Sequence, residues 1–436
     1  MKKIFALLFV TTFLISSISN SQTRSKGSLV IVGGGLEANN KSVFNQMIDL
    51  SGGATQAVFA VIPSAGGAPM QSFMYFRSEL ISYGVKPENI HLIPVAMMDD
   101  DSTRDVNESE WKNNGNDPHL ADLVRKCSAV WFTGGDQLRT MRTLIRPDGS
   151  KTPVLEAVWD VYLSGGVIGG TSAGAAIMSE VMIGAGTSIA ALSNGVVRDY
   201  SGNDLPADSG VLVTRGLGFF PHGLMDQHFN QRARIGRLAV TLMDEKKTGN
   251  PGSGGATNNN LGFGVDENTA LIYYGKEKKM KVAGVGGVTM LNTKDARISQ
   301  IDKVSVISNL LLNYLEEGDL YDFTTGSITP AEGKQSTLGK EHHRELYSDQ
   351  FGILSPNSVS FRDLYTIYLA DNKKVDTLIS TTSTGNNSGF MITLRKTVAT
   401  DCFYPGKPDH SDRYTVTNIR MDITPVHISV TPMKDK

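Results

Sequence analysis

Four short apolar runs, each followed by glycines or other small residues, mark the first half of the chain. They span residues 28–32, 57–63, 129–133 and 166–169. Unbroken apolar runs of this length are typical of strands that are buried on both faces of a parallel sheet. The stretches between the runs have helical character, as in residues 71–83. The pattern therefore predicts βαβ units and a doubly wound α/β sheet, whose ligands bind at the carboxyl ends of the strands.

The pattern changes in the second half of the chain. Residues 247–260 are rich in Gly and Asn and predict a surface loop, which leads into a strand over residues 261–265. Beyond about residue 325 the alternation of strands and helices stops. Residues 360–430 are rich in Thr, Val, Ile and Tyr, which favour strands. We therefore expect a small β-rich extension over residues 326–436, and its sequence does not indicate a role.

Residues 1–21 have the three-part form of a secretory signal peptide. Lys2 and Lys3 precede an apolar run over residues 4–14, and small residues follow that run. The run is shorter than the roughly 20 residues that a membrane-spanning helix needs. No cysteine lies near the expected cleavage region, which argues against a lipid anchor. We therefore expect a secreted or periplasmic protein without a membrane span.

Composition and charge narrow the class of protein. The chain has 436 residues, enough for two domains or one large one. Its 42 Lys and Arg against 44 Asp and Glu leave no excess of positive charge for nucleic acid. Cys127 and Cys402 are too few for a disulfide scaffold or a zinc cluster. His342, His343 and the acidic residues 99–101 are expected on the surface, and we expect no metal site.

The strongest chemical signal is residues 170–174, Gly-Thr-Ser-Ala-Gly, between a predicted buried strand and a predicted helix. This context is the one that a G-x-S-x-G nucleophile turn requires. A sharp turn would direct Ser172 out of the sheet and leave the Ala173 amide free to face an oxyanion. The alternative is a glycine-rich turn whose serine only caps a helix.

A nucleophilic serine needs a general base, and His228 is the best candidate among eight histidines. The residues around it carry more polar groups than the start of a helix with a purely structural role would need: Asp226, Gln227, Arg232, Arg234 and Arg237. His222 follows Pro221 in a predicted turn and is a weaker candidate. The other histidines lie in polar or irregular stretches, where surface positions are expected.

The acid that would orient the base stays open between two neighbouring residues. Asp266 and Glu267 follow the strand predicted over residues 261–265, and alternation along a strand lets only one of them face the site. Glu180 lies eight residues along the predicted helix from Ser172, about 12 Å by helical rise, which is too far. The pair Gly134–Gly135, at another strand end, would let backbone amides approach a carbonyl oxygen.

A nucleotide-binding motif is the main competing interpretation of the first glycine loop. Residues 33–38, Gly-Gly-Gly-Leu-Glu-Ala, fit the dinucleotide pattern after a strand. The acid that should follow the second strand is missing, since residues 59–63 end without one. We therefore do not expect a nucleotide cofactor.

Four motifs in order, FTGGDQ, GGTSAGA, DQHFNQRARIGRL and GFGVDENTAL, closely resemble the cyanophycinases. These belong to a serine peptidase family that also contains aspartyl dipeptidase. The resemblance covers about residues 26–325. It implies a flavodoxin-like, mostly parallel sheet related to class I glutamine amidotransferases, with a Ser-His-Glu triad. Carried over by motif, the nucleophile is Ser172, the base His228 and the acid Glu267, with the Gly135 and Ala173 amides as oxyanion donors.

The resemblance also implies a substrate. Cyanophycin is polyaspartate with an arginine on each β-carboxyl, and the implied products are β-Asp-Arg dipeptides released through an acyl-enzyme, with no cofactor. The positions implied to contact it are Gln137, Asp226, Gln227, Arg232, Arg234 and Arg237. Guanidiniums can bind the free carboxylates of the branches, and Asp226 can meet a substrate guanidinium. On a helix Arg232 and Arg234 would take opposite faces, so we expect at least one arginine only to orient others.

Two other functions are compatible with the same sequence. An exported peptidase similar to aspartyl dipeptidase would share the serine turn and cut short Asp-containing peptides. A binding protein on the same fold would keep the pocket without turnover. The sequence is also compatible with a homodimer.

Overall fold

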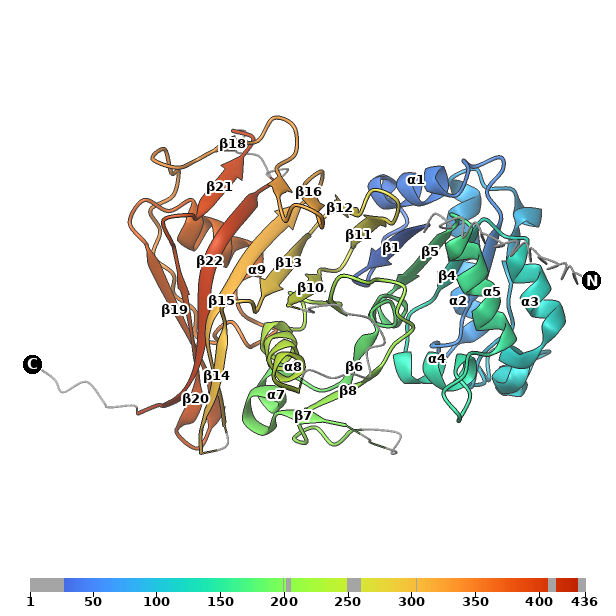
Figure 1. Ribbon diagram of the computed structural model, residues 1–436, viewed down its shortest axis with the longest axis horizontal. Coiled ribbons are helices and arrows are strands. Elements are labelled where there is room, and N and C mark those ends of the chain that lie inside the picture. The colour runs from blue at the N-terminus through green and yellow to red at the C-terminus, as the bar shows by residue number, and fades with distance from the viewer. Residues whose placement is uncertain are drawn as a thin grey trace, which may run out of the picture.

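The computed structural model describes residues 27–198, 200, 205–248, 260–302, 304–406 and 413–429 (Figure 1). The predicted signal peptide and most of the predicted Gly/Asn loop lie outside the described residues. The described chain contains two sheets, with helices packed mainly around the first (Figure 1). The α/β class that the apolar runs predicted is confirmed.

The first sheet has nine strands and a parallel core. Its order is β17-β16-β12-β11-β1-β5-β4-β2-β3, and β1, β5, β4, β2 and β3 are parallel. The strands of this core are β1 Ser28–Val32, β2 Phe59–Ile62, β3 Ile90–Leu92, β4 Ala129–Phe132 and β5 Val167–Thr171. The antiparallel side holds β11 Thr269–Tyr274, β12 Lys279–Gly284, β16 Leu320–Asp322 and β17 Ile328–Thr329. Four of the parallel strands are those that the apolar runs predicted.

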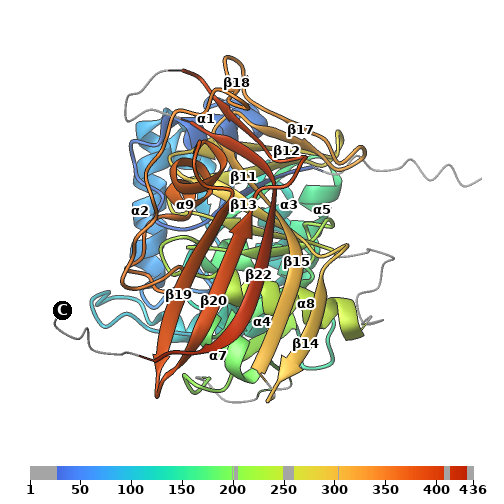
Figure 2. The same ribbon diagram turned by 90° about the vertical axis from the view of Figure 1, so that its left-hand side faces the viewer.

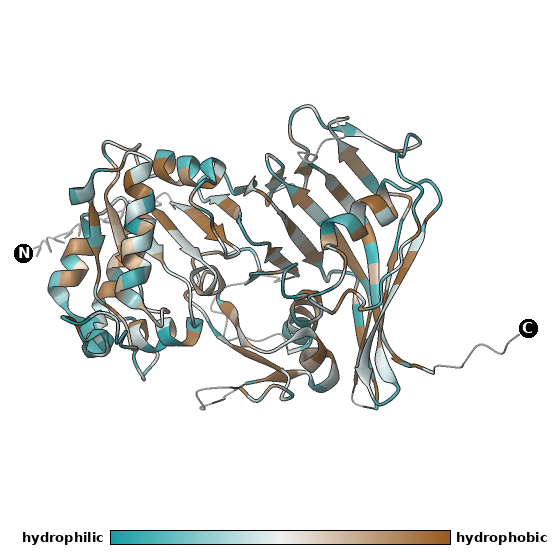
Figure 3. Cartoon of the chain, turned by 180° about the vertical axis from the view of Figure 1, so that it is seen from behind, coloured by the Kyte–Doolittle hydropathy of each residue, from teal (hydrophilic) through white to brown (hydrophobic). Residues whose placement is uncertain are grey.

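Helices cover both faces of the parallel core, because each helix buries one apolar stripe against the strands. They are α1 Lys41–Leu50, α2 Pro69–Ser82, α3 Pro118–Arg125, α4 Gln137–Leu144 and α5 Pro153–Leu163. Phe44 of α1 and Phe73 of α2 belong to one apolar cluster, whereas Val124 of α3 and Val158 of α5 belong to another. Figure 3 shows hydrophobic strands inside and helices of mixed hydropathy outside.

The second sheet is mostly antiparallel, and the apolar runs did not predict it. Its main order is β18-β21-β22-β15-β13-β10-β9-β6-β8-β7. Before residue 325 it contains β6 Val181–Ala185, β7 Val196–Val197, β8 Val211–Arg215, β9 Leu224–Asp226, β10 Leu261–Val265, β13 Gly287–Asn292, β14 Arg297–Ile301 and β15 Val304–Glu316. The helices α7 Ser188–Asn194 and α8 Ile235–Thr248 pack against each other beside this sheet (Figure 1).

The C-terminal extension, residues 326–436, adds the edge strand β17 to the first sheet and then continues the second sheet. It comprises β18 Gln335–Ser336, α9 Phe361–Tyr365, β19 Thr377–Gly385, β20 Ser388–Arg395, β21 Asp401–Tyr404 and β22 Thr415–His427. β22 pairs with β15, so the extension and the preceding chain share hydrogen-bonded strands (Figure 2). The predicted domain boundary near residue 325 stays a prediction. Shared strands show that the two parts are joined, but they do not tell whether residues 26–325 would be active without the extension.

Two local predictions are wrong. The helix after Ser172 is α6 Ala173–Ala176, only four residues long, and Glu180 lies beyond it, just before β6. Arg232 and Arg234 precede α8, so they do not take opposite faces of a helix. Ala233 has φ 49°, a value outside the helical region, which explains why the helix begins only at residue 235.

Among the described residues, no helix has the length and apolar character needed to cross a bilayer.

Candidate active site

Ser172 lies in a strained turn at the carboxyl end of β5. Its backbone has φ 55° and ψ −110°, and its amide donates to Val32 O of the neighbouring strand at 3.0 Å. The two glycines of the motif are needed for close packing. A Cβ on Gly170 would lie 2.6 Å from Gly174 O, and a Cβ on Gly174 would lie 2.4 Å from Phe132 O. The turn therefore directs the hydroxyl away from the sheet.

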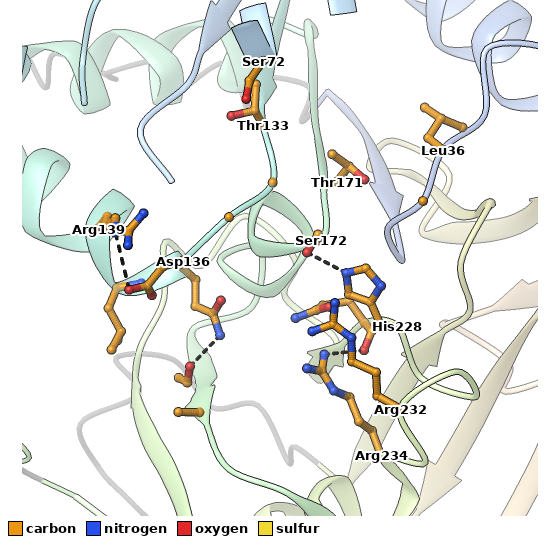
Figure 4. A pocket seen from close by; sticks show the side chains of 18 of the residues that line it. Leu36, Ser72, Thr133, Asp136, Arg139, Thr171, Ser172, His228, Arg232 and Arg234 are labelled. Carbon is orange, nitrogen blue, oxygen red and sulfur yellow. Dashed lines mark hydrogen bonds and ion pairs between the residues drawn. The ribbon is translucent and has the colours of Figure 1, made fainter. Parts of the chain in front are cut away.

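Ser172, His228 and Glu267 form one hydrogen-bonded chain. Ser172 Oγ lies 2.8 Å from His228 Nε2 (Figure 4). His228 Nδ1 lies 2.5 Å from Glu267 Oε1. Residues from three distant parts of the sequence thus meet between the two sheets. The arrangement has the geometry of a nucleophile, a base and an orienting acid.

The first glycine loop packs against this chain. Gly33 O accepts a hydrogen bond from the His228 amide at 2.6 Å. A Cβ on Gly34 would lie 2.2 Å from Cε1 of the imidazole, and one on Gly35 would lie 3.2 Å from Glu267 Oε2. By its sequence alone, this loop resembled only a nucleotide-binding motif. In the structure its glycines make room for the imidazole and the carboxylate.

The surroundings favour the neutral form of His228. Burial is the largest cause that lowers its pKa, and the positive charges of Arg232 and Arg234 lower it further. The hydrogen bond that the imidazole donates to Glu267 acts in the opposite direction. A neutral imidazole whose Nδ1 proton faces Glu267 has a free lone pair on Nε2, toward Ser172.

Asp266 and Glu267 have different surroundings. Asp266 is buried, accepts the Asn230 and Gly287 amides at 3.0 and 3.1 Å, and has its pKa raised to about 7 by burial. Glu267 faces His228, and its own amide donates to Gln231 Oε1 at 3.0 Å. Sequence reasoning missed Gln231, which ties the acid to the loop of the base.

Gly134 and Gly135 approach Ser172 from the end of β4. A Cβ on Gly134 would lie 3.3 Å from the Ser172 Cβ. Gly135 has φ 140°, and a Cβ there would lie 2.0 Å from Ala65 O. Within the described ranges, neither the Gly135 amide nor the Ala173 amide donates to a protein acceptor. Both amides are thus available to an oxyanion.

A cavity of about 1160 Å³ opens around Ser172 and His228. Arg232, Arg234 and Arg237 line one end of it, and Figure 4 shows Arg232 and Arg234 side by side beyond His228. Burial and the charge of Arg237 lower the pKa of Arg234 to about 9, so it stays positive at neutral pH. We call these three residues the arginine wall. Its charge favours carboxylate ligands.

Asp226 does not take the position that the sequence analysis expected. Its side chain is 1% exposed and is not among the residues that line the cavity. Its two oxygens accept Arg237 Nε at 2.8 Å and Nη2 at 2.5 Å. Asp226 therefore holds Arg237 and does not face the cavity. Arg237 also donates to Gly186 O at 2.7 Å.

The two predicted glutamines both line the cavity, with different partners. Gln137 Nε2 donates to Ile183 O at 2.9 Å and to Gly184 O at 2.7 Å, which ties α4 to β6. Gln227 is buried, and its Oε1 accepts no hydrogen bond from the described residues. That oxygen can accept an N–H group of a ligand.

The other candidate residues have structural partners. His222 Nε2 lies 2.8 Å from the Tyr273 hydroxyl, and its ring stacks on Phe323 with centroids 4.0 Å apart.

Cys127 and Cys402 are both buried free thiols. In the described part of the chain, no group of three His, Cys, Asp or Glu side chains could hold a metal ion.

Comparisons with known proteins agree with the predicted resemblance. No family model matches the chain. The chain is 29% identical over 307 residues to a cyanophycinase of Geminocystis herdmanii, covering 69% of this chain and 95% of that protein. It is also 29% identical over 323 residues to a cyanophycinase of Synechococcus elongatus, covering 72% and 84%. A solved peptidase from an acI-B1 actinobacterium has 20% identity and a TM-score of 0.45, covering 69% of this chain and 99% of that one. The resemblance to the cyanophycinases is confirmed.

Proposed function

We propose that the chain, like the cyanophycinases to which it is similar, is a peptidase that hydrolyses the backbone of cyanophycin. It would act as a serine-type exopeptidase and release β-Asp-Arg dipeptides. The observation that carries this proposal is the hydrogen-bonded chain Ser172–His228–Glu267 in a cavity that ends in the arginine wall.

The first step is attack by Ser172 on a backbone aspartyl carbonyl. His228 Nε2, 2.8 Å from Ser172 Oγ, takes the hydroxyl proton as the bond to carbon forms. Glu267 stabilises the imidazolium through Nδ1. The lowered pKa of His228 supports this role, because a base must be neutral before it can accept the proton.

The tetrahedral intermediate carries its negative charge on the former carbonyl oxygen. The amides of Gly135 and Ala173 would donate to that oxygen, and the field at the N-terminus of α6 points the same way. The imidazolium then gives its proton to the leaving amine. A water molecule, deprotonated by His228, attacks the acyl-enzyme and releases the second product.

The arginine wall would select the substrate. Arg232 and Arg234 would bind the α-carboxylates of arginyl branches, because a planar guanidinium holds a carboxylate through two parallel hydrogen bonds. Arg237 lines the same end, with its orientation held by Asp226. Gln227 Oε1 would accept a substrate N–H, and Gln137 would hold the adjacent wall in place.

Three further parts of the proposal concern the whole chain. The parallel core supports a flavodoxin-like fold related to class I glutamine amidotransferases. The form of residues 1–21 supports export to the periplasm or the medium. Residues 26–325 would carry the peptidase activity, since the matching motifs lie within them.

The test is release of soluble dipeptide from purified cyanophycin granules by the wild-type protein and by Ser172→Ala. We expect β-Asp-Arg from the wild type and a loss of at least a thousandfold in the variant. A panel of α-aspartyl dipeptides is run in parallel. Cleavage of those dipeptides with intact granules would assign the site to short Asp-containing peptides. Binding to granules without release from either substrate would show a binding protein.

A further inference from the structure

The end of the cavity opposite the arginine wall has no part in the mechanism above. Figure 4 shows Ser72 and Thr133 at this end, Arg232 and Arg234 at the other, and Ser172 between them. Helix α2 forms much of this end. Ser72, Tyr75, Phe76 and Glu79 all line the cavity, and their spacing of three, four and seven residues puts them on one helical face.

Three buried oxygen atoms at this end lack a hydrogen-bond donor among the described residues. They are Glu79 Oε1, Thr133 Oγ1 and Thr171 Oγ1. All three side chains line the cavity. Glu79 is only 5% exposed; burial raises its pKa, and hydrogen bonding of its carboxylate to Tyr75 acts in the opposite direction. A buried acceptor without a donor is costly, so three of them beside one cavity indicate a ligand that brings donors.

The charge at this end has the opposite sign to that of the arginine wall. Hydrogen bonding to Glu79 and the negative charge of Glu79 are the two largest causes of a raised pKa of the Tyr75 phenol, followed by burial and the charge of Glu37. Arg139 also lines the cavity, but it is paired with Asp136, with Nε 3.8 Å from Oδ2. Tyr75 lines the same cavity and is 58% exposed, so part of its ring is open to a ligand.

We propose that Glu79, Thr133 and Thr171 form a subsite for a guanidinium of the substrate, on the opposite side of Ser172 from the arginine wall. A guanidinium has five N–H donors and no acceptor, which matches one carboxylate and two hydroxyl oxygens. The exposed face of Tyr75 gives it a ring on which to stack. An arginyl branch would then place its carboxylate toward one end and its guanidinium toward the other. This inference rests on the proposed function and adds a second determinant of specificity to it.

The test compares two synthetic aspartyl peptides, one with arginine branches and one with citrulline, which has the same shape without the charge. We expect the wild type to prefer arginine in kcat/KM, and Glu79→Gln to reduce that preference about tenfold. Glu88→Gln changes an exposed acid outside the cavity and should leave the preference unchanged. Thermal unfolding of each variant verifies that it is folded.

A binding measurement separates the subsite from the proposed reaction. Affinities of both peptides are measured by calorimetry in Ser172→Ala, with and without Glu79→Gln. If Ser172→Ala binds the arginine peptide more tightly and Glu79→Gln removes this preference, the subsite is supported. If the wild type nevertheless cleaves neither peptide, only the proposed function is overturned. Equal affinities in Ser172→Ala, or a preference that survives Glu79→Gln, would overturn the subsite and leave the proposed reaction standing.

Discussion

At the scale of single residues, the charges around His228 determine the pH at which it can act as a base. Arg232 and Arg234 repel the imidazolium, and burial disfavours it further. Arg232→Gln removes one of these charges, so the pKa of His228 should rise. Since the proposed attack by Ser172 requires a neutral imidazole, the reactivity of Ser172 in this variant should be lost at a higher pH than in the wild type as the solution is acidified.

The measurement is the rate at which a small, uncharged serine-directed reagent labels Ser172 across the pH range. Such a reagent avoids the loss of substrate binding that Arg232→Gln would also cause. Arg139→Gln is the matched control, because Arg139 lines the same cavity but is not among the charges that act on His228. An acidic limb that stays in place in Arg232→Gln would contradict the electrostatic argument.

At the scale of elements, a buried ion pair joins β9 to α8. Asp226 ends the strand and Arg237 lies in the first turn of the helix, with side chains 1% and 3% exposed. Asp226→Ala leaves the guanidinium buried without its anion, at an expected cost of about 3–5 kcal/mol in the free energy of unfolding. Chemical denaturation measures this cost.

The control is an ion pair of the same type on the surface. Arg125 and Asp160 are 39% and 46% exposed, and Nε lies 2.9 Å from Oδ2. Asp160→Ala should cost less than about 1 kcal/mol, because solvent screens both charges. Similar losses in the two variants would show that burial does not set the strength of the Asp226–Arg237 contact.

Elements differed in how well the sequence predicted them. The parallel strands were predictable because a strand buried on both faces is an unbroken apolar run, as in β1 and β4. β9 has three residues and depends on pairing with β6 and β10, so it leaves no pattern of its own. The spacing of Arg232, Arg234 and Arg237 suggested one helix, but positive φ angles at His228 and Ala233 delay its start.

The candidate site was predictable to a different extent. The G-x-S-x-G turn marks Ser172 locally, because a strained turn needs those glycines. Alternation along a strand left Asp266 and Glu267 open, and only the resemblance chose between them. Gln231 and the packing of Gly34 on the imidazole depend on contacts between distant segments, so no local pattern indicates them.

At the scale of the whole molecule, the C-terminal extension contacts the loop that carries His228. The Phe361 amide of α9 donates to Asn230 Oδ1 at 2.8 Å, and the Phe361 ring lies edge-on to Phe229 with centroids 5.6 Å apart. Phe229 and Asn230 directly follow His228 in the sequence. The extension therefore supports the loop of the proposed base, in addition to completing the second sheet.

Phe361→Ala tests this support. Loss of a buried ring should cost about 3–5 kcal/mol in the free energy of unfolding. If the ring also holds the loop in place, labelling of Ser172 should slow several-fold under conditions where the variant is fully folded, because His228 is less often within reach of Ser172. Denaturation and labelling kinetics measure the two effects separately.

Phe390→Ala distinguishes support of the loop from general loss of stability. Phe390 lies in β20, is 3% exposed and belongs to the same apolar cluster as Phe361. The substitution Phe390→Ala should lower the free energy of unfolding by a similar amount and leave the labelling rate of Ser172 unchanged. If Ser172 is labelled equally slowly in both variants, the effect comes from a general loss of stability of the fold. If both label at the wild-type rate, the extension does not position His228. Slow labelling in Phe361→Ala alone assigns the extension a part in the chemistry, because only that ring contacts the loop through Phe229.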